Sequence, residues 1–112
     1  MFRPHLGEFE EIVLLTVAVL DDKAYGISIK SDIESRLERN VSVGAMRTAL
    51  KRLEDKGYLA SRLGEPTAVR GGKRKRYFTI TTSGKRALEY VMDMRKRLWS
   101  AIPFASLDFK FI

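Results

Sequence analysis

Apolar residues recur at helical spacing through the first third of the chain. Between residues 6 and 20 they cover one face and part of its flanks, and the acidic residues of the first turns suit the positive end of a helix dipole. A turn at residues 21–23 precedes a second helix, which begins near Gly26 and carries an apolar stripe of Ile29, Ile33 and Leu37. Asn40 is expected to end it, because asparagine tolerates the left-handed conformation common at helix C-termini.

The third predicted helix has the clearest start and end signals. Ser42 is a good N-cap, and Lys56 followed by Gly57 is a typical helix ending. Met46, Leu50 and Leu53 form its apolar stripe. The opposite face is polar and basic and carries Arg47, Thr48, Lys51 and Arg52.

After Gly57 the pattern changes from helical to alternating. Residues 58–63 and 76–81 are predicted to be antiparallel strands, and the Gly- and Pro-containing segment 64–75 is predicted to be a long loop between them. Thr82 or Ser83 should then cap a last helix that runs to about Ile102, before Pro103.

The last helix has more apolar surface than one small body can cover. Its apolar or small residues alternate by three and four, as in a coiled-coil seam. We therefore predict a homodimer whose interface contains Ala87, Val91, Met94, Leu98 and Ala101.

This order of elements is the layout of a winged helix-turn-helix. We predict an α+β, mostly helical fold with three helices, a β-hairpin wing and a C-terminal dimerisation helix. Residues 1–81 would form the DNA-binding domain, residues 82–102 the dimerisation helix, and residues 103–112 an apolar tail without an assigned role.

Charge is segregated along the chain. Residues 1–40 carry a net charge of −3 and residues 41–112 a net charge of +10, which together give the +7 of the whole chain. This asymmetry points to a polyanionic partner for the second part only. The 112 residues contain no cysteine, no apolar run long enough to span a bilayer and no signal-peptide pattern, so we expect a cytoplasmic protein without a membrane partner.

Two basic segments are candidates for contact with double-stranded DNA. Residues 70–76, at the end of the hairpin loop, hold five cations in seven residues and no acid, and they are expected to contact phosphates through Arg70, Lys73, Arg74, Lys75 and Arg76. A solvated loop that aids solubility is the alternative. The third helix is expected to enter the major groove and to contact DNA through Ser42, Gly44, Arg47, Thr48 and Lys51. Its alternative is a surface helix with ordinary ion pairs to Glu54 and Asp55.

Catalytic chemistry finds no constellation in the sequence. His5 is the only histidine and lies near the terminus, and Glu8, Glu10 and Glu11 have no histidine or cysteine beside them to suggest a metal site. We therefore predict no catalytic residues, no metal, no cofactor and no enzymatic activity. Trp99, the only tryptophan, is most simply a packing residue; the alternative is that Trp99 and Met92 hold a small aromatic effector.

From residue 6 to residue 102 the chain resembles the PadR family of winged-helix transcriptional regulators, in its short form with one helix after the wing. The resemblance rests on an ordered set of motifs: Leu6-Gly7, Tyr25-Gly26, Val41-Ser42-Val43-Gly44, Leu50-Lys51-Arg52-Leu53-Glu54 with Gly57, and Gly72-Lys73-Arg74-Lys75-Arg76-Tyr77 leading to Ile80-Thr81 and Gly84. The family commonly has Tyr-Pro where this chain has Arg47-Thr48, and Thr-Pro-x-Gly where it has residues 81–84. The first departure bears on base preference.

The resemblance implies a homodimer joined through the last helix that acts as a repressor and is released from DNA by small, often aromatic, effectors. Two other functions remain open at the level of sequence. A winged-helix module for protein contact or RNA binding is the main alternative, and a nucleic-acid-processing enzyme is disfavoured by the missing catalytic clusters.

Overall fold

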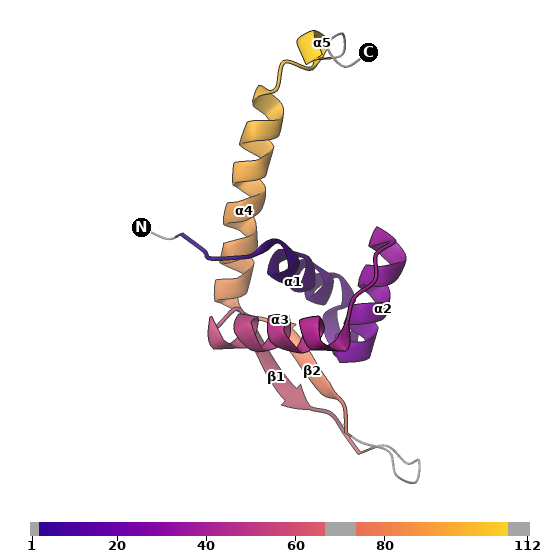
Figure 1. The fold of residues 1–112 in the computed structure, drawn as a ribbon. Helices are drawn as coiled ribbons and strands as arrows, with labels where there is room; N and C mark the ends of the chain where they lie inside the picture. Colours follow the sequence, from indigo (N-terminus) through magenta and orange to yellow (C-terminus); the bar gives the residue numbers. More distant parts are fainter. Residues whose placement is uncertain (1–2, 67–73, 108–112) are drawn as a thin grey trace.

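The computed structural model describes residues 3–66 and 74–107. The elements follow in the order α1 (Glu8–Leu20), a 3-10 turn η1 (Asp21–Lys23), α2 (Gly26–Leu37), α3 (Val43–Asp55), β1 (Leu59–Leu63), β2 (Arg76–Ile80), α4 (Thr82–Ala101) and α5 (Phe104–Leu107). In Figure 1, α1 to α3 form a body from which the hairpin projects on one side and α4 on the other, over a length of 62 Å. The mostly helical fold with an antiparallel hairpin is confirmed.

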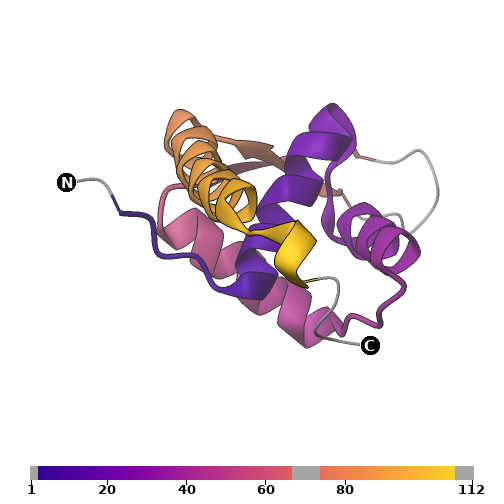
Figure 2. The same ribbon diagram turned by 90° about the horizontal axis from the view of Figure 1, so that it is seen from above.

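Helix α1 lies at the centre of the body. It contacts α2, α3, β2 and α4, and Figure 2 shows it between α4 and α2 when seen from above. Val13, Leu14 and Val17 of α1 are buried. They meet the predicted stripes of α2 and α3, of which five residues are buried: Ile29, Ile33, Met46, Leu50 and Leu53. Each such side chain contributes about 1.5–3 kcal/mol relative to an exposed one.

The C-terminus of α2 lies earlier than predicted. The helix ends at Leu37, which is half-exposed, and Glu38 takes the left-handed conformation with φ 50°. Asn40 is therefore not the terminator. The chain turns early because Val41 must enter the core, where its N–H donates to the Glu34 carboxylate at 3.0 Å.

Both predicted ends of α3 are confirmed. The Ser42 side chain accepts a hydrogen bond from the Ala45 N–H at 3.0 Å, so it satisfies one of the free donors of the first turn. Beyond the other end, Gly57 has φ 81°, a conformation that favours glycine. This turn leads directly into β1, and the ends of α3 and the hairpin are thereby fixed to one another.

The hairpin has the predicted antiparallel pairing, with Leu59 opposite Ile80 and Leu63 opposite Arg76. The N-cap of α4, however, is Thr81 rather than Thr82 or Ser83. The Thr81 hydroxyl accepts from the Gly84 N–H at 3.0 Å and donates to the Gly57 carbonyl at 2.6 Å. The Thr81 N–H donates to the Tyr58 carbonyl at 3.0 Å and so continues the hairpin register by one residue. The helix therefore begins only after Thr81, which becomes its cap.

Only the first half of α4 packs on the body. Ala87, Leu88 and Val91 are buried, and Arg95 reaches back to Glu11 with an Nη2–Oε1 distance of 2.9 Å. The rest of the helix stands clear in Figure 1. In the described ranges, no helix is long and apolar enough to cross a membrane.

Glu10 anchors the segment before α1 to the turn after α3. Its Oε1 accepts from Lys56 Nζ at 2.7 Å and from the Gly7 N–H at 2.9 Å, and Lys56 also donates to the His5 carbonyl. Burial by itself raises the pKa of Glu10, but these hydrogen bonds and the charges of Lys56 and Arg52 outweigh it. The pKa of Glu10 therefore lies below its ordinary value.

We expect Glu10→Gln to lower the free energy of unfolding by about 2 kcal/mol at pH 7, since it removes a charge-assisted hydrogen bond from a largely buried site. A carboxylate with a lowered pKa stabilises the folded state above its unfolded-state pKa of about 4.3 and loses that effect as the pH falls through the lowered value. Urea denaturation at pH 7 and pH 3 should therefore show the difference from wild type shrinking at pH 3. Glu8→Gln, at an exposed ion pair with Arg39, is the control, and an equal difference at both pH values would contradict this account.

Candidate nucleic-acid interface

The solvent face of α3 is basic and free at its N-terminal end. Arg47, Thr48 and Lys51 are exposed, opposite the buried stripe of the same helix, and Ser42 and Gly44 are exposed at its start. Within the described part of the chain no hydrogen bond or ion pair to Arg47 is present. Lys51 pairs with Asp55 at 3.3 Å, but both side chains are well exposed, so the pair adds little stability and can open.

The described wing cations are exposed but already engaged. Arg74 Nε donates to the Gly64 carbonyl at 2.8 Å, and Arg76 Nη1 donates to Ser61 Oγ at 3.1 Å. Each guanidinium has further N–H groups that can donate to other acceptors, because arginine has five. Arg70 and Lys73, also predicted as wing contacts, lie outside the described residues.

Ser61 connects the hairpin to α3. Its hydroxyl donates to Glu54 Oε2 at 2.6 Å while it accepts from Arg76, so a chain of hydrogen bonds runs from β2 through β1 to α3. This chain fixes the hairpin relative to α3. From the sequence, Glu54 is expected only as an ion-pair partner for cations of its own helix, because a contact across elements is not visible in local spacing.

A cluster of aromatic rings and cations joins the hairpin to the start of α2. The rings of Tyr25 and Tyr77 meet edge to face with centroids 5.6 Å apart. Lys75 Nζ lies 4.3 Å from the Tyr25 centroid and the Arg62 guanidinium lies 5.1 Å from that of Tyr77. The sequence did not predict that these side chains form one cluster. Its only signal was that Tyr25 and Tyr77 each lie at the start of an element.

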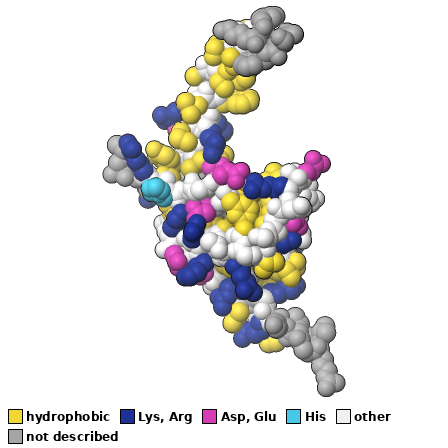
Figure 3. Space-filling model, in the orientation of Figure 1, with side chains coloured by type: hydrophobic (Ala, Val, Ile, Leu, Met, Phe, Trp, Pro, Cys, Tyr) yellow, Lys and Arg dark blue, Asp and Glu magenta, His cyan; other side chains and the backbone are white. Residues whose placement is uncertain are grey.

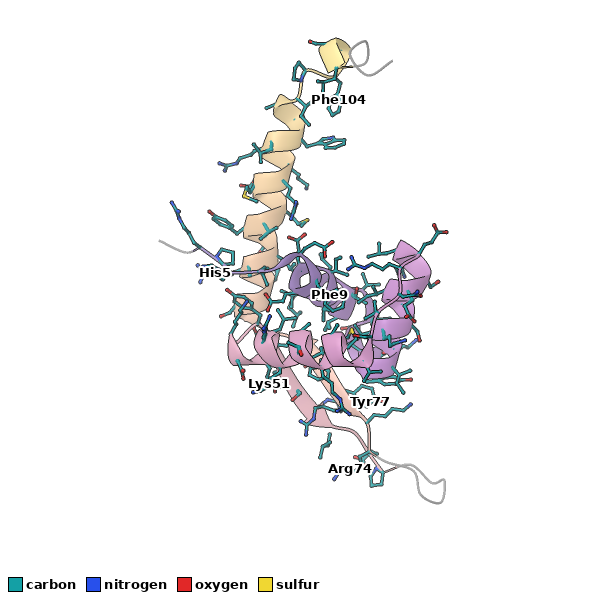
Figure 4. All side chains as sticks on the ribbon, viewed as in Figure 1. His5, Phe9, Lys51, Arg74, Tyr77 and Phe104 are labelled. Atoms are coloured by element: carbon teal, nitrogen blue, oxygen red, sulfur yellow. The ribbon has the colours of Figure 1, made fainter. Side chains whose placement is uncertain are left out.

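These elements place cations along one end of the molecule. In Figure 4, Lys51 on α3 and Tyr77 and Arg74 on the hairpin lie on the side of the body opposite α4. Figure 3 shows Lys and Arg side chains over α3 and the hairpin, and hydrophobic side chains along the upper part of α4. An α-helix fits the width of a DNA major groove, and a basic hairpin beside it can contact the phosphates that border the groove.

The structure narrows the predicted dimer interface on α4. Ala87 and Val91 are covered by their own chain, so they offer almost no surface to a partner. Met94, Leu98 and Ala101 remain exposed, with Leu98 65% accessible. The exposed part of the seam is therefore the half beyond Val91.

Trp99 lies on the same exposed half of α4. It is 66% accessible and its ring contacts Phe104, with centroids 5.1 Å apart and planes at 57°. Met92, Leu98 and Trp99 line a shallow hollow of about 560 Å³ that is open to solvent. An open hollow of this kind becomes an enclosed site only when another surface covers it.

The remaining candidates for chemistry have structural roles. Among residues 3–66 and 74–107, no three His, Cys, Asp or Glu side chains are grouped in a way that could hold a metal ion. Glu10 is held by Lys56, Glu11 by Arg95, and Glu8 by Arg39. The three glutamates considered as a metal cluster thus pair with three separate segments: the residues after α3, helix α4 and the residues after α2.

Comparison with known proteins agrees with this architecture. The model of the transcriptional regulator PadR-like family matches residues 14–90. The crystal structure of a PadR family transcription regulator from Clostridium difficile R20291 is 31% identical, covers 80% of this chain and 91% of its own, and has a TM-score of 0.65. No functionally curated protein matches the sequence.

Two more distant structures share the fold. A PadR-like transcriptional regulator from Bacillus cereus is 17% identical, with a TM-score of 0.70 over 88% of this chain and 91% of its own. Bacillus subtilis PadR, solved in complex with operator DNA, is 22% identical, with a TM-score of 0.62 over 76% of this chain and 46% of its own. The family consists of transcriptional regulators and not of enzymes, in agreement with the sequence prediction. The winged helix-turn-helix fold, the match over residues 14–90 and the 31% identity together show that this chain belongs to the PadR-like family of transcriptional regulators.

Proposed function

We propose that this regulator is a cytoplasmic homodimer that binds a specific sequence of double-stranded DNA and represses transcription from it. The observation that carries the proposal is the exposed face of α3, where Arg47 is free to reach a base edge beside the cations of the hairpin. The complex of Bacillus subtilis PadR with operator DNA supports a DNA partner for this fold.

The two basic elements have different roles in this proposal. Arg47 and Lys51 read base edges in the major groove, because a guanidinium or ammonium can pair with guanine O6 and N7. Ser42, Gly44 and Thr48 lie on the same exposed surface and make the close contacts around them. Arg74, Lys75 and Arg76, with Arg70 and Lys73, contact phosphates, which fixes the position of α3 without selecting a sequence.

Selection of duplexes from a random library by the purified protein, followed by titration of variants, tests this division. Arg47→Ala should weaken the selected duplex by roughly 1–3 kcal/mol and leave binding to random DNA almost unchanged. Arg76→Ala should weaken both duplexes by the same factor. If Arg47→Ala weakens both equally, α3 is not the reading element.

Binding should also depend strongly on salt. With about three phosphates neutralised in each subunit, log K against log salt should have a slope near −5. Fluorescence anisotropy between 50 and 300 mM salt (roughly the range in which such slopes are linear) measures it. A slope near zero would remove the electrostatic basis of the proposal.

Dimerisation through α4 follows from the exposed seam. Met94 and Leu98 face solvent on the half of α4 that extends beyond the body. A contiguous exposed apolar surface usually marks an interaction site. Two copies joined there would present two α3 helices to half-sites centred about 10 base pairs apart, or a multiple of that spacing.

We expect the protein to sediment as a dimer at micromolar concentration and Leu98→Glu to sediment as a monomer with weakened DNA binding, because a charge cannot be buried in an apolar interface without a partner. Leu98 is preferred to Val91 for this test, since Val91 supports the fold of the single chain. Leu37→Glu, at an exposed leucine on α2, should stay dimeric. A monomeric unmodified protein would refute the interface.

The hollow beside Trp99 is the proposed effector site, formed in full when a partner helix covers it. Planar aromatic compounds would stack on the indole, with Met92 and Leu98 as adaptable walls. Binding shifts DNA affinity only if the compound prefers one arrangement of the two α3 helices.

Fluorescence of Trp99, the only tryptophan, should be quenched by such a compound in parallel with release of labelled DNA. Trp99→Leu should abolish the response to the compound while DNA binding without it persists. Unchanged emission across a panel of planar aromatic compounds would leave Trp99 as a packing residue.

A further inference from the structure

Two aliphatic side chains are exposed beside Arg47, and neither belongs to the buried core. Ile27 is 72% accessible in the first turn of α2, and Val43 is 58% accessible as the first residue of α3. Together with Arg47 they line a cleft of about 240 Å³ between the two helices, whose floor is made by Met46 and Leu50. The surface of this part of α3 is therefore apolar next to its free cation.

The glycine that follows Val43 is also unexplained by the fold. A Cβ on Gly44 would meet no atom within 4 Å, and its backbone does not lie in the left-handed region. Gly84 is a contrasting case, because a Cβ there would collide with the Tyr58 carbonyl. Gly44 is the second residue of α3, and the protein's own packing does not require a glycine there. The bare backbone at this position leaves room for close approach by another molecule.

The helical geometry relates Val43 to Arg47. They are four residues apart, so they lie on the same edge of α3 with a rise of about 6 Å between them, whereas successive base pairs are about 3.4 Å apart. Side chains at these positions reach the same or neighbouring base pairs when the N-terminal part of α3 enters the groove. In the major groove, thymine presents its C5-methyl group, which is recognised by apolar contact, and guanine presents acceptors for arginine.

We infer that Val43 is a specificity-determining residue that reads the methyl group of a thymine next to the guanine contacted by Arg47. The methyl group lies in the cleft against Val43, Ile27 forms the opposite wall, and the bare backbone at Gly44 lets the helix approach closely enough for the contact. The inference rests on the proposed function and extends it from a cation that reads guanine to a defined two-base step in each half-site.

Uracil substitution tests this contact, since deoxyuridine differs from thymidine only by the methyl group. Duplexes selected by the full-length protein are resynthesised with each thymine replaced in turn, and dissociation constants are measured by anisotropy. One thymine adjacent to a guanine should weaken binding about fourfold when replaced, the factor expected for burial of one methyl-sized group.

Val43→Ala should bind the thymine and uracil duplexes nearly equally, because it removes both γ-methyl groups. Val43→Thr, which replaces one γ-methyl by a hydroxyl and keeps the other, should show an intermediate ratio. Val19→Ala, at a valine on α1 with 57% accessibility, should keep the fourfold ratio. Circular dichroism melting confirms that each variant is folded.

The outcomes separate this inference from the proposed function. Selection of a duplex that is bound tightly but is insensitive to every uracil would overturn the role of Val43 and leave DNA reading intact. Retention of the fourfold ratio by Val43→Ala would do the same. Failure to select any duplex would overturn the proposed function and this inference with it.

Discussion

The structure depends on the burial of α1. Its apolar residues occupy more than one face, so α2, α3, the hairpin and the first half of α4 all pack against it. Leu14 and Val13 are fully buried, and the inner stripe of α3 closes over this region. Because α3 places its apolar face on α1, the face that carries Arg47 and Lys51 must point outward.

Polar contacts then fix the positions that burial leaves free. Lys56 ties the segment before α1 to the end of α3, and Glu54 ties α3 to the hairpin through Ser61. The bonds of Lys56 join segments that are distant in sequence, the Ser61–Glu54 bond joins two successive elements, and each of these bonds is charge-assisted. They hold the basic hairpin in a fixed position beside α3. Two elements that contact one rigid duplex together need such a fixed relative position.

The two halves of helix α4 have different surroundings. Its first half completes the body with Ala87, Leu88 and Val91, while its second half presents Leu98 and Trp99 to solvent. The pair between Glu11 and Arg95 lies at the transition between them. A different contact on the exposed half of α4 would therefore shift the body through one end of a rigid helix. This is the physical link between the proposed effector site and the proposed spacing of the α3 helices.

The sequence by itself determined the class of fold and the elements up to residue 102, because helical and alternating periodicities, Ser42 and Gly57 act within a few residues of chain. It did not predict the short helix α5 in the tail. It also placed the basic face of α3, since residues opposite an apolar stripe must be exposed. Two other element ends were decided by tertiary contacts: α2 stops before Asn40 because Val41 is buried in the core, and the cap of α4 falls on Thr81 because its N–H donates to the Tyr58 carbonyl. Only the tertiary structure showed that Ala87 and Val91 are buried against the chain's own body. It alone showed that Ile27 and Val43 line one cleft with Arg47. Such facts depend on which faces of separate helices come together, and local spacing carries no information about that.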